Sequence, residues 1–187
     1  MFFSIESSLM GYLFELHGDY PALDIFFIAV ANYSTHFFVV VFLMVAASLF
    51  YYKFKLNKQV WLSSLLILPG VLLANYLLRV TVNRNRPFTL EEEFSSLLYH
   101  YYHNSFPSNH AAASFAVAGI VYLLSPRWGK LLFVLAALVS ISRVYTGLHF
   151  PSDVLAGAML SLAFLFLFCR YRESLLQIYK KTIGKSY

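Results

Sequence analysis

Five apolar stretches, each long enough to cross a lipid bilayer, constrain the fold of this chain more than any other feature of its sequence. A transmembrane helix needs about 17 to 25 predominantly apolar residues. Runs of this kind cover Ile25–Tyr52, Val60–Val82, Ser108–Ser125, Gly129–Tyr145 and Asp153–Cys169. Only 12% of the 187 residues are charged, whereas soluble domains carry roughly 25%. The sequence therefore predicts an all-α, polytopic membrane helix bundle that forms a single domain over residues 1–187.

The N-terminal segment has a different pattern. Within residues 2–17, Ile5, Leu9 and Leu13 follow one another at a spacing of four, which places them on one face of a helix. We expect this helix to lie in the membrane interface, with a short sixth span as the alternative. The segment contains acidic residues and lacks the basic start of a signal peptide, so we expect it to belong to the mature protein.

The distribution of positive charge orients the five spans. Ten of the 14 basic residues fall on one side, which is assigned to the cytoplasm: Lys53, Lys55, Lys58, Arg127, Lys130, Arg170, Arg172, Lys180, Lys181 and Lys185. The other four fall on the outer side: Arg79, Arg84, Arg86 and Arg143. Positive charge is disfavoured there, so these arginines require an anionic partner. Nucleic acid is not expected, because the basic residues are not clustered and lipid-facing helices leave little surface for it.

Three short polar stretches fall at the outer ends of the predicted spans. They are Arg79–Pro87 (RVTVNRNRP), Pro107–His110 (PSNH) and Ser142–Asp153 (SRVYTGLHFPSD). The planar guanidinium of arginine suits phosphate oxygens. A helix that begins near Ser108 would also direct free backbone amides at an anion. The three stretches therefore predict a site for one phosphate or for two linked phosphates.

Two histidines and one aspartate in these stretches can carry out phosphate chemistry. His149 and Asp153 are four residues apart, so the carboxylate can fix the imidazole tautomer and leave the other nitrogen free to attack. His110 can then act as the acid for the leaving group and later as the base for water. A carboxylate cluster for Mg²⁺ does not accompany them; Glu91, Glu92 and Glu93 fit a solvated acidic loop better. We therefore expect neither a metal nor another cofactor.

These motifs resemble the signature of the type 2 phosphatidic acid phosphatase (PAP2) superfamily, which reads K-x6-R-P, P-S-x-H and S-R-x5-H-x3-D. The matching residues are, in chain order, Arg86, Pro87, Pro107, Ser108, His110, Ser142, Arg143, His149 and Asp153. The resemblance implies that His149 is a phosphohistidine nucleophile, Asp153 its orienter and His110 the acid and base. It also implies a metal-free phosphate site formed by Arg79, Arg86, Ser108, Asn109 and Arg143.

The sequence departs from the family pattern at two positions. Arg79 stands where the first motif has lysine, which retains the charge and changes its geometry. Asn109 stands where the second motif usually has glycine, and its side chain can add a hydrogen-bond donor. Arg84 lies outside the motifs, and two interpretations apply to it: contact with a second phosphate, or a position among lipid headgroups.

Other polar residues have simpler interpretations. His100 and His103 lie among tyrosines and fit an interfacial belt better than a substrate entrance. Asn32, Ser34, Thr35 and His36 fall inside the first span, where we expect hydrogen bonds between helices. The small residues Ala112, Ala116, Gly157 and Ser161 predict close helix packing.

Within the superfamily, the phrases NRNRPF, SFPSNH and HFPSDVLAG resemble the bacterial bacitracin-resistance type of undecaprenyl-diphosphate phosphatase. This resemblance implies a multi-pass protein of a bacterial cell membrane, with its active site on the extracytoplasmic face and a diphosphate lipid as substrate. The alternative is a phosphatidylglycerophosphate or phosphatidate phosphatase. A vanadate-dependent haloperoxidase would share the site but be soluble, and a lipid or anion transporter would not need the complete catalytic set. No protein partner is evident.

Overall fold

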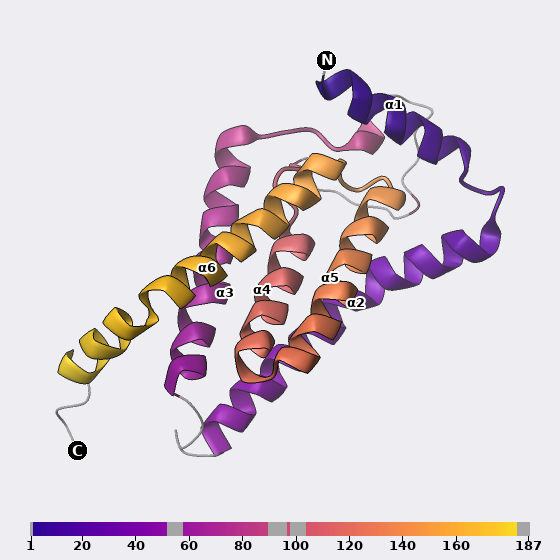
Figure 1. Cartoon of the computed structure of the whole chain (residues 1–187). Helices are drawn as coiled ribbons and strands as arrows, with labels where there is room; N and C mark the ends of the chain where they lie inside the picture. The colour runs from indigo at the N-terminus through magenta and orange to yellow at the C-terminus, as the bar shows by residue number, and fades with distance from the viewer. Residues whose placement is uncertain (1, 52–57, 90–96, 98–103, 183–187) are drawn as a thin grey trace.

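The computed structural model describes residues 2–51, 58–89, 97 and 104–182, and over these residues the regular structure is entirely helical (Figure 1). Its elements, in chain order, are α1 (Phe2–Glu15), α2 (Pro21–Tyr51), α3 (Lys58–Val82), the 3-10 turn η1 (Pro87–Thr89), α4 (Asn109–Leu124), α5 (Pro126–Tyr145) and α6 (Pro151–Thr182). The five long helices α2 to α6 correspond to the five predicted apolar runs. The predicted all-α bundle is confirmed.

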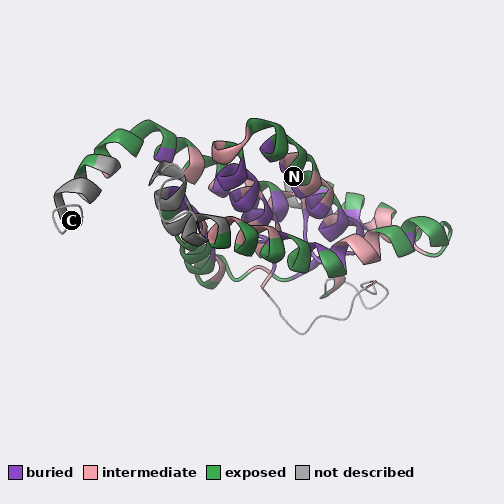
Figure 2. Ribbon diagram, turned by 90° about the horizontal axis from the view of Figure 1, so that it is seen from below, coloured by how far each residue is buried: buried purple, intermediate pink, exposed green. Residues whose placement is uncertain are grey.

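Four of these helices, α2, α3, α5 and α6, are long and apolar enough to cross a membrane. With 16 residues, α4 is shorter, about 24 Å at 1.5 Å per residue. It is also the most enclosed, because it packs against α2, α3, α5 and α6. Figure 2 shows buried residues gathered at the centre of the bundle and exposed residues on its outer helices. The exposed side chains of α2 include Ile25, Phe26 and Met44, as a lipid-facing surface requires.

Small residues let α4 and α6 approach closely, as the sequence predicted. The hydroxyl of Ser161 donates to the carbonyl of Ala112 at 2.6 Å. A Cβ on Gly157 would lie 2.6 Å from the carbonyl oxygen of Ser108, so a larger residue would separate the two helices. This contact positions the N-terminus of α4 against the first turns of α6.

Helices α4 and α5 form a tight hairpin. Ser125 is both the C-cap of α4 and the N-cap of α5. Pro126 follows in the first turn of α5, a position that suits proline. A Cβ on Gly129 would lie 2.3 Å from the Cα of Tyr122, so the backbones of the two helices touch at this end. The open end of the hairpin carries His110 and Arg143.

The amphipathic helix α1 lies across the end of the bundle where α3 and α5 end and α4 and α6 begin (Figure 1). Its 14 residues extend about 21 Å, less than the roughly 30 Å of a bilayer core, so it is too short to span. Ile5 and Leu9 are exposed, whereas Met10 is buried against the bundle. The imidazole of His17, just after α1, lies 2.8 Å from the carbonyl oxygen of Tyr145.

The prediction for the polar residues of the first span is wrong. Asn32, Thr35 and His36 are exposed on the surface of α2. Ser34 is buried, yet among the described residues its hydroxyl has no hydrogen-bond partner. Asn32, Thr35 and His36 are at positions i, i+3 and i+4 and share one exposed face of α2, whereas Ser34 lies on the buried side.

Candidate active site

The turn between α5 and α6 holds His149 at the end of the bundle. The carbonyl oxygen of Arg143 accepts hydrogen bonds from the backbone N–H groups of Leu148 and His149, both at 3.1 Å. This tight return requires Gly147, whose φ of +75° is a conformation that residues with a Cβ rarely adopt. A Cβ there would also lie 2.6 Å from the ring of Phe14 in α1. The result is a buried imidazole, 2% exposed, in a chain segment with little freedom.

Asp153 lies in the first turn of α6 with its carboxylate beside His149. Its Oδ2 accepts a hydrogen bond from the backbone N–H of Phe150 at 2.8 Å, as in a capping box. The hydroxyl of Ser105 also donates to Oδ2. The distance from Oδ2 to Nδ1 of His149 is 3.7 Å, which is an ion-pair distance and too long for a hydrogen bond. The predicted proximity of this pair is confirmed.

The other imidazole nitrogen of His149 faces arginine. Nη1 of Arg86 lies 3.5 Å from Nε2 of His149 and donates to the carbonyl of Leu148 at 2.7 Å. Nη2 of Arg143 donates to the carbonyl of Ala31 in α2 at 2.8 Å. Within the described part of the chain, Nε of Arg79 and Nε of Arg143 are buried without hydrogen-bond partners. These buried, cationic donors fit an anion bound in front of Nε2.

The surroundings of His149 determine its charge. Burial lowers the pKa of His149 to about 4, and the positive charges of Arg86 and Arg143 act in the same direction, against the opposing effect of Asp153. The imidazole is therefore neutral at neutral pH, and its Nε2 can carry the lone pair that a nucleophile requires.

We expect the imidazole of His149 to remain neutral as the pH falls from 7 to about 4, because its protonation is disfavoured by burial. The measurement is an NMR titration of protein labelled with ¹⁵N-histidine, in which the His149 resonance is identified by its absence from His149→Ala. A midpoint near the ordinary value of 6.5 would contradict the expectation.

The second motif forms the start of α4. Ser108 is its N-cap: the side chain accepts from the backbone N–H of Ala111 at 3.5 Å, and the Ser108 N–H donates to the Asp153 carbonyl at 3.0 Å. The side-chain oxygen of Asn109 accepts a hydrogen bond from the amide of Asn75 in α3. The first turn of α4 is thereby fixed to both α3 and α6.

His110, in the same turn, lines a cavity of about 260 Å³ between α2, α3 and α4. Its other polar lining residues are Ser34, Thr35, Asn109 and Ser114. The remainder is mostly apolar, with Phe38, Phe42, Leu68, Leu72 and Val117 among its lining residues. A group that His110 protonates could therefore continue into an apolar chain.

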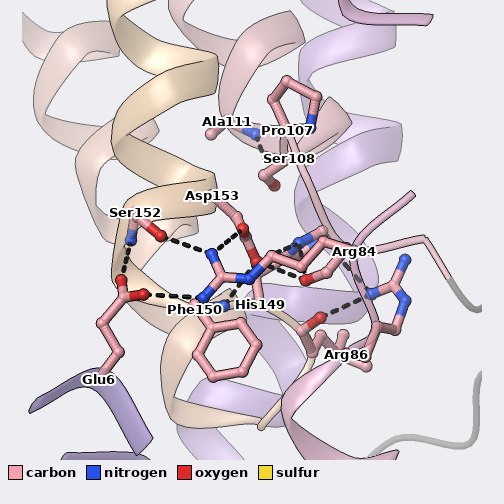
Figure 3. A network of polar contacts seen from close by, with 12 residues as sticks. Glu6, Arg84, Arg86, Pro107, Ser108, Ala111, His149, Phe150, Ser152 and Asp153 are labelled. Carbon is pink, nitrogen blue, oxygen red and sulfur yellow. Dashed lines mark hydrogen bonds and ion pairs between the residues drawn. The ribbon is translucent and has the colours of Figure 1, made fainter. Parts of the chain in front are cut away.

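Arg84 is separated from the other arginines. It lies on the far side of Asp153, where its Nη1 donates to Oδ1 at 2.9 Å (Figure 3). Contact of Arg84 with a second phosphate stays a prediction, and the observed contacts give the guanidinium a different set of partners.

Three residues of this site were missed by the sequence analysis: Glu6, Asn75 and Ser105. Asn75 had a recognisable signal, because it is a polar residue inside an apolar span and lies four residues before Arg79 on the same helix face. Ser105 and Glu6 had none, since their contacts with Asp153 and Arg84 join distant parts of the chain.

Some predicted residues lie outside the described part of the chain. These are Glu91, Glu92, Glu93, His100 and His103. Within the described part, no group of three or more His, Cys, Asp or Glu side chains is arranged to hold a metal ion.

Comparison with known proteins identifies the family to which this chain belongs. A family model described as the PAP2 superfamily matches residues 60–176, which is more than half of the chain. The bacitracin transport permease protein BcrC of Bacillus licheniformis is 36% identical over 102 residues, covering 51% of this chain and 50% of that protein. The undecaprenyl-diphosphatase BcrC of Bacillus subtilis is 29% identical over 121 residues, covering 61% of this chain and 62% of that protein. The matches thus span about half to three fifths of these relatives.

A solved structure resembles the whole bundle. The crystal structure of a transmembrane PAP2 type phosphatidylglycerolphosphate phosphatase from Bacillus subtilis has a TM-score of 0.73 at 27% identity. The match covers 91% of this chain and 86% of that one.

Proposed function

Since the chain belongs to the PAP2 superfamily, we propose that it is a lipid phosphatase that releases phosphate from undecaprenyl diphosphate through a phosphohistidine intermediate. The observation that carries this proposal is the position of His149. It is buried and neutral, with Asp153 beside Nδ1 and Arg86 beside Nε2. An imidazole in this arrangement has its lone pair directed at the place where the arginines would hold a phosphoryl group.

In the first step, Nε2 of His149 attacks the terminal phosphorus, a P–N bond forms and the bond to the bridging oxygen breaks. Arg79, Arg86 and Arg143 neutralise the charge that develops on the transferred phosphoryl group. The carboxylate of Asp153 stabilises the positive charge that the imidazole gains. Protonated His110 donates its proton to the leaving oxygen of the lipid monophosphate.

In the second step, water attacks the phosphohistidine. His110, now neutral, accepts a proton from this water, the P–N bond breaks and inorganic phosphate is released. His149 returns to its neutral form and His110 to its protonated form, so the cycle closes.

A lipid substrate is supported by the cavity beside His110. Because His110 would protonate the leaving group, the leaving group must lie next to this mostly apolar space between α2, α3 and α4. A water-soluble leaving group would gain nothing from such a lining, whereas the first part of a hydrocarbon chain would bury apolar surface there.

The choice of a diphosphate is supported by the relatives. The Bacillus subtilis relative is an undecaprenyl-diphosphatase. The distribution of lysine and arginine supports an extracytoplasmic site in a bacterial cell membrane. Phosphatidylglycerophosphate is the second candidate, because the protein with the similar solved structure is a phosphatidylglycerolphosphate phosphatase.

The substrate is tested by comparing turnover of three lipids by purified protein in detergent: undecaprenyl diphosphate, phosphatidylglycerophosphate and phosphatidate. We expect the highest kcat/KM for undecaprenyl diphosphate. A higher value for either glycerolipid would reject that substrate and leave lipid phosphatase activity in place, whereas no release of phosphate from any lipid would reject both.

We expect activity to persist in excess EDTA, because the arginines supply the positive charge that Mg²⁺ would otherwise provide. Vanadate should inhibit, since it can form a trigonal-bipyramidal adduct on His149. Both effects are measured as phosphate release at a fixed lipid-to-detergent ratio. Loss of activity in EDTA with recovery on adding Mg²⁺ would bring Glu91, Glu92 and Glu93 back as ligands.

A further inference from the structure

Arg84 contacts two segments that are far from it in the sequence, α1 and the start of α6. Its Nη1 donates to the hydroxyl of Ser152 at 2.7 Å and to Oδ1 of Asp153 at 2.9 Å, while its Nη2 donates to Oε2 of Glu6 at 2.8 Å. The guanidinium also lies over the ring of Phe150, 3.9 Å from its centroid. Both terminal nitrogens and one face of the guanidinium are therefore in contact with protein (Figure 3).

Glu6 completes this network from α1. Its second oxygen, Oε1, accepts a hydrogen bond from the backbone N–H of Ser152 at 2.8 Å. That N–H belongs to the first turn of α6, where backbone donors lack partners within the helix. Burial alone would raise the pKa of Glu6, but the hydrogen bonds from Arg84 and Ser152 outweigh it and hold the pKa below its usual value. Glu6 is therefore an anion that binds both Arg84 and the N-terminus of α6.

The two oxygens of Asp153 have separate partners. Oδ2 accepts from Ser105 and from the N–H of Phe150 and lies beside His149. Oδ1 accepts from Arg84. Arg84 thus holds the oxygen that faces away from the imidazole, while Ser105 and the N–H of Phe150 hold the oxygen beside it.

From these contacts we propose that Glu6 and Arg84 are positioning residues for the catalytic pair: Glu6 holds Arg84, and Arg84 holds the Asp153 carboxylate in the orientation that serves His149. The proposal rests on the proposed function and adds a role for α1 in it. It assigns Arg84 to the catalytic carboxylate and not to the substrate.

The amphipathic character of α1 gives this network a further property. Glu6 faces the bundle, whereas its neighbour Ile5 and Leu9, one turn away from Ile5, are exposed on the other face of the helix. The same helix therefore contacts Arg84 on one side and presents apolar side chains to the membrane interface on the other. The orientation of Asp153 thereby depends on α1 remaining docked.

The test uses the full-length protein and two variants, Glu6→Gln and Arg84→Ala, with Glu15→Gln as the matched control. Glu15 is an exposed glutamate on the same helix. Glutamine is nearly isosteric with glutamate, but its amide group would meet the donors of Arg84 or Ser152, so one contact is lost without a cavity. We expect kcat to fall by about 10- to 150-fold in each variant, as for loss of a charge-assisted hydrogen bond.

Three features of the kinetics separate positioning from substrate binding. The fall should appear in kcat with KM little changed, and it should be equal for undecaprenyl diphosphate and phosphatidate. The double variant should be no slower than Arg84→Ala alone, because Glu6 acts through Arg84. Rates are normalised to folded protein by size-exclusion chromatography. A rise in KM restricted to the diphosphate lipid would make Arg84 a ligand of the second phosphate and overturn the proposal.

A second measurement is independent of the lipid. The charged groups that face the imidazole of His149 are Arg86 and Arg143 directly, Asp153 beside it, and Arg84 and Glu6 behind Asp153. Removing the positive charge of Arg84 should raise the midpoint of the His149 NMR titration, and removing the negative charge of Glu6 should lower it. A change that only loosened the fold would not move the midpoint in opposite directions.

Both results are needed for support: the fall in kcat and the opposite shifts of the titration. Where the unaltered protein hydrolyses lipid, absence of either one overturns the proposal. If the unaltered protein hydrolyses none of the lipids, the proposed function fails, and the titration alone then decides whether Glu6 and Arg84 position the His149–Asp153 pair.

Discussion

Replacing His149 with alanine is expected to abolish phosphate release, with a fall in turnover of roughly 10⁴-fold or more, because no covalent intermediate can then form. The measurement is phosphate release from undecaprenyl diphosphate under single-turnover conditions. In the unaltered protein, rapid quenching should trap phosphate on His149, where tandem mass spectrometry can locate it.

The matched control for this variant is His36→Ala. His36 is also a histidine but is exposed on α2, so its loss should leave turnover unchanged. Folding of both variants is checked by size-exclusion chromatography in detergent. Substantial residual hydrolysis by folded His149→Ala, or trapped phosphate on another residue, would contradict the assignment.

Replacing Asp153 with asparagine is expected to lower kcat on the order of 10³- to 10⁴-fold, the size of effect found when an aspartate that orients a catalytic histidine is replaced in this way. The side-chain oxygen can still accept from Arg84 in the place of Oδ1, but the NH₂ group in the place of Oδ2 can then donate to Nδ1 of His149. The proton would consequently sit on Nε2, the nitrogen that must attack. Nε2 also lies 3.5 Å from a donor of Arg86, so the altered tautomer would be unfavourable as well as inactive.

This prediction is checked by measuring kcat together with the amount of phosphohistidine that accumulates. The amount should fall with kcat, because formation of the P–N bond is the step that needs the lone pair on Nε2. A folded Asp153→Asn variant that keeps more than about a tenth of its kcat would show that Asp153 is not needed to set the tautomer.

Much of the fold could be predicted because membrane helices are constrained by length and composition. Each of the five apolar runs became a helix, and the alternation of their directions brought Arg86, Ser108, Arg143 and His149 to one end. The hydropathy pattern could not predict that α4 is enclosed by the other four helices. Burial inside a bundle and exposure to lipid both require apolar residues, so hydropathy does not distinguish them.

The central pair of the site was predictable for a local reason. His149 and Asp153 lie within one turn of each other, and the glycine at 147 and the proline at 151 determine the bend between α5 and α6. The partners of this pair were not predictable in the same way. Ser105 lies 48 residues from Asp153, and Glu6 lies 146 residues from Ser152, and no sequence periodicity connects positions so far apart.

Arg84 shows how a correct charge argument can still leave a residue's partner open. The sequence predicts anionic partners for four arginines, and for Arg84 the structure supplies them from within the chain, as Glu6 and Asp153. The sequence analysis counted neither carboxylate as a partner of an arginine. Glu6 is 78 residues from Arg84 and Asp153 is 69 residues from it, so no sequence pattern indicated either contact.

Because α4 and α5 form a hairpin, the positions of two site residues depend on the junction at the opposite end of the bundle. Its two arms carry His110 and Arg143 at their tips, and they are joined by a single residue where Gly129 touches the backbone of Tyr122. Because the two helices meet at so short a junction, a small displacement there becomes a larger displacement at their other ends. A side chain at position 129 would therefore move His110 and Arg143 apart without contacting either of them.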